Sequence, residues 1–134
     1  MKILGISSEI VECLRVARMI ERHEEAFLNR VYTPREARWC RGRRNVTEHF
    51  AGHWAAKQAV LKCLAGNKRK GLVLTEIEIR LDRTRVPKVY LGGAARERAV
   101  SLRIADMMLT IAHCRAFATA MVIVLGREPN RSPK

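Results

Sequence analysis

The segment His49-Phe-Ala-Gly-His-Trp-Ala-Ala-Lys-Gln-Ala-Val-Leu-Lys-Cys-Leu-Ala65 decides the fold. At 100° per residue its bulky apolar side chains gather on one side of a helix: Phe50, Trp54, Leu61 and Leu64. Its small residues gather on the other side: Ala51, Gly52, Ala55, Ala56, Ala59 and Cys63. A helix that is apolar on both sides is buried on both. We therefore expect a central helix around which the rest of the chain packs.

This helix carries only a few polar side chains, and their presence on a buried helix needs an explanation. Gln58 and Lys62 are i,i+4 neighbours at the edge of the small side. Lys57 lies among the bulky residues, so we expect its stem to extend along them until the ammonium reaches water or an anion. Two interpretations stay open, because such groups form either a site for an anionic ligand or an ion, or the solvated ends of a packed helix.

Length and composition limit the class of protein. With 134 residues we expect one domain over residues 1–126, followed by a polar, disordered tail over 127–134. A net charge of +13 predicts acidic partners, among them nucleic acid, an anionic membrane, an acidic protein or a phosphorylated small molecule. Aromatic residues make up only 5%, too few for a base-stacking surface. Four widely spaced cysteines and no membrane-length apolar run favour a cytoplasmic location.

The order of the expected helices and strands along the chain predicts an α+β fold, with an antiparallel sheet covered by helices. Thr33-Pro34-Arg35-Glu36 has the form of a capping box and starts a helix that should stop at Gly42. The other expected helices span 9–22, 23–31 and 94–103. The expected strands span 2–6, 75–81, 88–91, 107–112 and 117–125.

The first expected helix carries two candidate sites. Ser7-Ser8 would cap it, which places Glu9 in the first turn, where the helix dipole favours a carboxylate. Glu9 could equally be a metal ligand at the strand–helix junction. A basic stripe follows at spacings of three and four: Arg15, Arg18, Met19 and Arg22. Around an exposed Met, such a stripe suits either an acidic, partly apolar partner helix or a solvated helix face.

Four segments, taken together, resemble the holo-acyl-carrier-protein synthases, which are small 4′-phosphopantetheinyl transferases. Ile3–Glu12 is similar to the family's opening strand and its Gly-x-Asp-Ile-Val-Glu junction. Phe50–Lys62 is similar to its Phe-Ala-x-Arg-Phe-Ala-Ala-Lys-Glu-Ala…Lys helix. Val86-Pro87 resembles its Gly-Lys-Pro turn. Met108–His113 and Phe117–Ala120 resemble its penultimate strand and Tyr-Ala-x-Ala ending.

This resemblance implies a Mg²⁺-dependent transfer of 4′-phosphopantetheine from coenzyme A to a serine of an acyl carrier protein, as in fatty acid biosynthesis. It implies catalytic roles for Lys62 and Glu9, and Mg²⁺ ligation by Glu9 and Gln58. The implied coenzyme A contacts are Lys57, Lys62, His53, Gly66, Thr110 and His113. It further implies that the basic stripe docks the carrier protein, and that the chain forms a homotrimer with no membrane or nucleic-acid partner.

The chain departs from the family pattern at important positions. Glu9 stands in place of an Asp, Gln58 in place of the metal-binding Glu, and His53 in place of an Arg. The change at Gln58 removes a full negative charge, so Mg²⁺ affinity should fall. An alternative is therefore a catalytically weak or inactive paralogue that still binds coenzyme A or a carrier protein. A nucleic-acid-binding protein is a third hypothesis, which only the positive charge supports.

Overall fold

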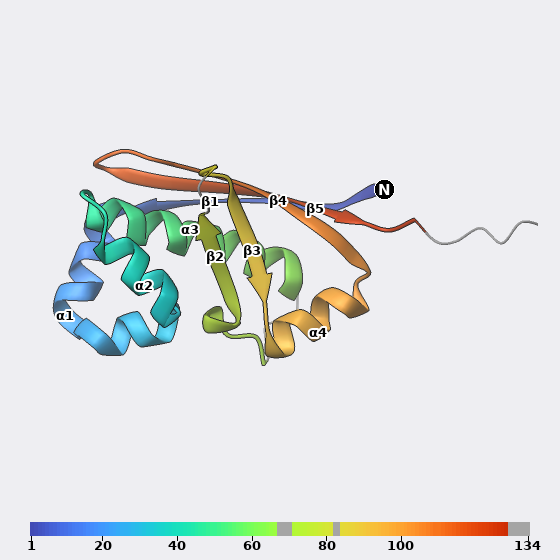
Figure 1. The fold of residues 1–134 in the computed structure, drawn as a ribbon, viewed down its shortest axis with the longest axis horizontal. Coiled ribbons are helices and arrows are strands. Elements are labelled where there is room, and N and C mark those ends of the chain that lie inside the picture. The colour runs from blue at the N-terminus through green and yellow to red at the C-terminus, as the bar shows by residue number, and fades with distance from the viewer. Residues whose placement is uncertain (67–70, 82–83, 129–134) are drawn as a thin grey trace, which may run out of the picture.

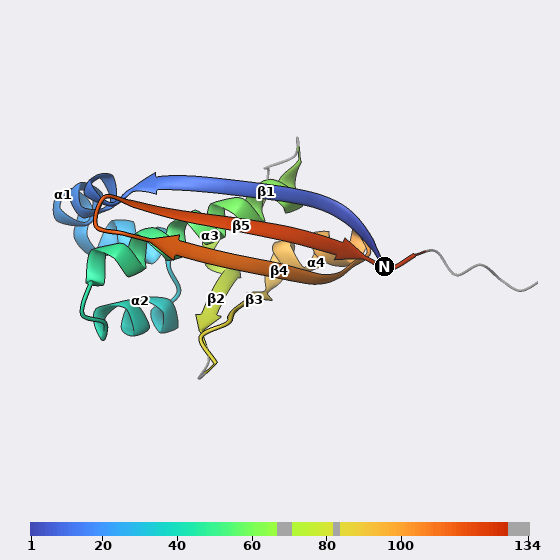
Figure 2. The same cartoon turned by 90° about the horizontal axis from the view of Figure 1, so that it is seen from above.

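A three-stranded antiparallel sheet lies on one side of the molecule in the computed structural model, which describes residues 1–66, 71–81 and 84–128. Its strands are β1 (Lys2–Glu12), β4 (Ile104–His113) and β5 (Phe117–Gly126), in the order β1-β5-β4 (Figures 1 and 2). A separate two-stranded ribbon consists of β2 (Ile77–Leu81) and β3 (Pro87–Leu91). The predicted α+β class with antiparallel strands is confirmed.

The central helix α3 (Val46–Ala65) lies against the inner face of the sheet (Figure 1). Residues from both of its predicted sides are buried, including Phe50 at 2% exposure and Ala55 at 0%. The small side permits a close approach to the sheet, because a Cβ added at Gly52 would lie only 3.1 Å from the Ile111 side chain. The two-sided pattern of the segment thus predicted its position correctly.

The first strand is longer than we expected, and the first helix starts later. β1 continues to Glu12, which pairs with Phe117, and α1 begins only at Cys13. Ser7-Ser8 therefore caps no helix, and Glu9 lies within the strand opposite Ala120. β1 pairs with β5 from Lys2 to Glu12, and this antiparallel ladder outweighs the local cap signal.

Three further helices complete the fold: α1 (Cys13–Val31), α2 (Pro34–Arg41) and α4 (Gly93–Ser101). α1 joins the two helices that we expected, across a kink at Glu24 with φ 47°. α2 starts with the predicted capping box, because Thr33 accepts from the Glu36 amide and Glu36 accepts from the Thr33 amide. Residues 67–70, residues 82–83 and residues 129–134 of the predicted tail lie outside the described residues.

All of these helices lie on one face of the three-stranded sheet, and within the described residues the opposite face carries no helix (Figure 1). Among the helices in the described parts of the chain, none is long and apolar enough to cross a membrane.

Candidate functional site

An ion pair joins β1 to the last turn of α3. Lys62 Nζ lies 2.7 Å from Glu9 Oε1 and donates a hydrogen bond of 2.9 Å to the Ser8 carbonyl oxygen. The side chains are partly accessible, at 40% for Lys62 and 25% for Glu9. The strand conformation brings this about, since Glu9 lies on the side of β1 that faces α3. Two residues that sequence reasoning named for catalysis are therefore in direct contact.

A pocket of about 470 Å³ opens beside this pair. Its lining residues are Ser8, Glu9, Ile10, Lys62, Thr110, Thr119, Ala120 and Met121. Thr110, another predicted contact, also lines this pocket. Gln58 lies one helical turn before Lys62 and is half-buried. Gln58 is not among the residues that line this pocket.

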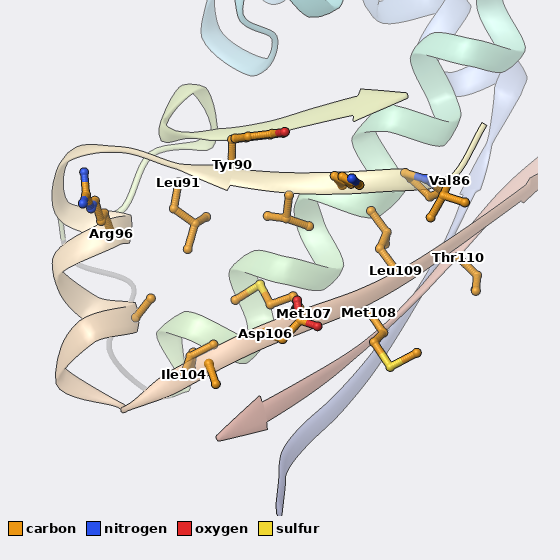
Figure 3. Close-up of a pocket in the computed structure, with 15 residues that line it drawn as sticks. Val86, Tyr90, Leu91, Arg96, Ile104, Asp106, Met107, Met108, Leu109 and Thr110 are labelled. Carbon is orange, nitrogen blue, oxygen red and sulfur yellow. Dashed lines mark hydrogen bonds between the residues drawn. The ribbon is translucent and has the colours of Figure 1, made fainter. Parts of the chain in front are cut away.

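A larger groove of about 890 Å³ runs between β3 and β4 beside α4 (Figure 3). Leu91, Met107 and Leu109 point into it, which makes its floor apolar. Met108 and Thr110 point away from it, toward the uncovered face of the sheet (Figure 3). Thr110 borders both this groove and the pocket beside Glu9, and its side chain points to the uncovered face.

Lys57 reaches an anion, as we expected, but this anion is a carboxylate inside the protein, so the structure contradicts a coenzyme A contact for Lys57. Its ammonium contacts the Glu36 carboxylate, and both side chains are fully buried. Glu36 also accepts from the amides of Thr33, at 2.9 Å, and Ile79, at 3.0 Å. Burial raises the pKa of Glu36 and lowers the pKa of Lys57, and their mutual attraction opposes both shifts. The pair fastens α2, α3 and β2 together.

His53 is likewise an interior residue, only 2% exposed, so the structure contradicts a phosphate contact for it. Its Nδ1 donates to the His49 carbonyl oxygen at 3.0 Å and lies 3.7 Å from Cys40 Sγ. Burial lowers the pKa of His53 to about 4, so the ring is neutral near pH 7. A neutral, enclosed imidazole cannot take over the role of an exposed arginine.

Gly66 and His113 lie outside the pocket. Gly66 ends α3, and its amide donates to the Lys62 carbonyl oxygen at 3.2 Å, so this N–H is already used. His113 lies at the end of β4, where its ring is 2.8 Å from the Glu48 carboxylate. Neither residue is among those that line the pocket beside Glu9 and the Lys62 side chain.

The basic stripe lies on α1, at the end of the molecule near the β4–β5 turn (Figure 1). Arg15, Arg18 and Arg22 are exposed as expected, whereas Met19 is half-buried and packs against the core. The Arg15 guanidinium lies 5.6 Å from the centre of the Trp54 ring. Sequence reasoning missed both this contact and the role of Glu36. The only available signal for Glu36 was its place in the capping box.

Three comparisons place the chain among known proteins. A family model described as the 4′-phosphopantetheinyl transferase superfamily matches residues 6–121. A holo-[acyl-carrier-protein] synthase of Rhodopirellula baltica is 40% identical over 124 residues, covering 92% of this chain and 98% of that protein. A holo-ACP-synthase structure from Plasmodium yoelii matches with a TM-score of 0.81 and 26% identity, covering 95% of this chain and 98% of that one.

A Helicobacter pylori holo-[acyl-carrier-protein] synthase, solved in complex with coenzyme A, matches with a TM-score of 0.76 and 27% identity, covering 90% of this chain and 100% of that one.

Proposed function

The chain belongs to the 4′-phosphopantetheinyl transferase superfamily, and we propose that it acts through the pocket formed by Glu9, Lys62 and Thr110. Its function is that of a holo-acyl-carrier-protein synthase, the transfer of 4′-phosphopantetheine from coenzyme A to a carrier serine. The serine oxygen bonds to phosphorus as the bond from that phosphorus to adenosine 3′,5′-bisphosphate breaks, and the serine proton is released. The observation that carries the site assignment is the accessible Lys62 ammonium beside a carboxylate.

Lys62 is the residue that we assign to coenzyme A. Coenzyme A is a polyanion, and the ammonium of Lys62 is partly accessible at the mouth of the pocket. A cation placed there offsets the negative charge on the phosphate oxygens as the transfer proceeds. The net charge of +13 also favours the approach of the substrate.

The oxygen donors at this site fit Mg²⁺, which prefers one or two carboxylates together with substrate phosphates. Glu9 supplies one carboxylate, and Gln58 would supply a neutral amide oxygen. When bound, the ion would stabilise the negative charge of the diphosphate. Glu9 and Gln58 would hold the ion, while Lys62 orients the phosphates that it contacts.

The basic stripe is our proposed docking surface for the carrier protein. Arg15, Arg18 and Arg22 are exposed on one helix, ahead of its kink, and their charge complements an acidic helix. The half-buried Met19 fixes the stripe to the core beneath it.

We also propose a homotrimer, which the family resemblance implies and the uncovered sheet face supports. Large apolar side chains stand exposed on this face: Ile6, Ile10, Met108, Phe117 and Met121. An apolar patch of this kind favours association with further copies of the chain. The enzyme would serve fatty acid biosynthesis in the cytoplasm, and its four free cysteines suit that compartment.

A second candidate is a catalytically weak or inactive paralogue that binds coenzyme A or a carrier protein. Gln58 favours it, because the site holds one carboxylate where the family pattern has two, and Lys62 already neutralises that carboxylate.

A Mg²⁺ titration of pantetheine transfer separates the two candidates. We expect transfer at high Mg²⁺ in the wild type, and Gln58→Glu, which restores the charge, should shift the titration to lower Mg²⁺ and raise turnover. Glu9→Gln should abolish transfer. Absence of transfer at every Mg²⁺ concentration would reject the enzyme assignment in favour of binding alone. A Gln58→Glu curve that overlays the wild type would exclude residue 58 as a ligand.

A further inference from the structure

Glu9 and Lys62 form an ion pair with each other in the free protein. Their charged atoms lie 2.7 Å apart, and the ammonium makes a second bond, of 2.9 Å, to the Ser8 carbonyl oxygen. The neighbouring Gln58 is neutral, so these three side chains carry no net charge. A divalent cation therefore meets a site whose only carboxylate is already paired. The phosphates of coenzyme A, in turn, meet an ammonium that already has two acceptors.

The Glu9–Lys62 pair is more exposed than the ion pair that Lys57 of α3 forms with Glu36. Glu36 and Lys57 are fully buried, so no external ion can replace either partner. Glu9 and Lys62 line an open pocket, and water reaches both side chains. Partly exposed ion pairs contribute little to stability, so ligands can open this pair at small cost.

We infer that the Glu9–Lys62 pair is a closed state of the site, which a divalent cation and coenzyme A open jointly. The inference rests on the proposed function, in which Glu9 holds the ion and Lys62 holds phosphate. Whichever ligand binds first breaks the ion pair and leaves the other partner free. The second ligand then binds without that cost, so each tightens the binding of the other. Lys62 thus competes with the cation for the Glu9 carboxylate in the free protein. Once coenzyme A is bound, Lys62 contacts phosphate instead and no longer opposes cation binding.

Removing one partner of the pair should therefore tighten binding of the ligand that the other partner holds. Lys62→Met should raise the affinity of the free protein for Mn²⁺ on the order of tenfold, since it removes a unit positive charge that lies 2.7 Å from the Glu9 carboxylate. Glu9→Gln should tighten coenzyme A binding when a chelator removes all metal. If Lys62 did not compete with the cation, Lys62→Met would leave Mn²⁺ binding unchanged.

The test is a titration of Mn²⁺ into each protein without coenzyme A, with free Mn²⁺ measured by electron paramagnetic resonance. Lys2→Met and Glu12→Gln are the matched controls, because they make the same charge changes at exposed positions of β1. Calorimetry with coenzyme A and chelator provides the second arm. Circular dichroism checks folding, with Lys62→Gln as the substitute if Lys62→Met does not fold.

Tighter Mn²⁺ binding by Lys62→Met than by Lys2→Met, together with tighter coenzyme A binding by Glu9→Gln than by Glu12→Gln, would support the closed state. No gain over the matched control in either arm would overturn it. A transfer assay on the same wild-type preparation keeps the outcomes apart. Transfer without these gains refutes the closed state alone, and gains without transfer refute the enzyme assignment alone.

Discussion

Lys57→Met tests the finding that this lysine is a structural residue rather than a ligand contact. Methionine keeps the apolar stem but removes the ammonium, which leaves Glu36 fully buried with two backbone donors in place of three partners. Breaking a buried pair from one side costs about 3–5 kcal/mol. A domain is stable by only about 5–15 kcal/mol, so we expect a large fall in the midpoint of urea unfolding.

The stability of the Lys57→Met variant should also depend on pH, in a direction that follows from the pKa of Glu36. Burial raises the pKa of Glu36, and Lys57 is the main cause that opposes the rise. Without Lys57 the folded pKa lies further above the unfolded value. A raised pKa means that the carboxyl is stable in the fold when protonated, so the free energy of unfolding should fall as pH rises from about 5 to 8.

The double variant Glu36→Gln/Lys57→Met is the control, because it leaves no buried charge. It should be more stable than Lys57→Met at pH 8. The reasoning is refuted if Lys57→Met unfolds at the wild-type urea concentration while its coenzyme A affinity falls, since Lys57 would then contact the ligand.

Three further predictions concern the stripe, the buried histidine and the phosphate contact. Arg15→Glu should raise the KM for the carrier protein at least tenfold and leave the Kd of coenzyme A nearly unchanged, because charge reversal adds repulsion to lost attraction; the reverse pattern would show that the stripe is misassigned. Because burial lowers the pKa of His53 to about 4, the wild type should lose roughly 2 kcal/mol of stability as pH falls from about 7 to 4.5. His53→Asn should lose less over that range, and equal losses in urea unfolding would contradict the assignment. Lys62→Ala should weaken coenzyme A binding about tenfold or more in calorimetry, and an unchanged Kd would exclude the phosphate contact.

Much of the fold follows from local sequence. The two-sided pattern of α3 predicted a buried helix because apolar residues at this spacing have no aqueous side. The capping box of α2 predicted its start because Thr33 and Glu36 satisfy each other within one turn. The strand expected over 75–81 is present as β2 from Ile77 to Leu81, where Ile77 and Ile79 are buried.

The predictions that were wrong concern residues whose environment depends on contacts between segments far apart in the sequence. Ser7-Ser8 has the local form of an N-cap, but β5 pairs with β1 through Glu12 and keeps it extended. Lys57 has the form of a helix-surface lysine, but Glu36 from another helix reaches it inside the core. No local pattern contains that partner.

For the candidate site, the family resemblance predicted a set of residues, and the structure places only some of them at the pocket. Glu9, Lys62 and Thr110 line one pocket, which extends across β5 because β5 lies between β1 and β4 in the sheet. His53 holds the position of an exposed family residue, yet its shorter side chain turns to the His49 carbonyl oxygen and Cys40. Position in a motif identifies where a residue lies along the chain, whereas its accessibility depends on its own size and partners.

Mass analysis of the carrier serine tests the central claim most directly. Wild-type protein is incubated with coenzyme A, Mg²⁺ and an apo acyl carrier protein, and the carrier is digested and sequenced by mass spectrometry. We predict phosphopantetheine on the serine, one adenosine 3′,5′-bisphosphate released per modified carrier, and near-complete loss of both in Glu9→Gln and Lys62→Ala. An unmodified serine with folded wild-type protein, or undiminished transfer by either variant, would contradict the account.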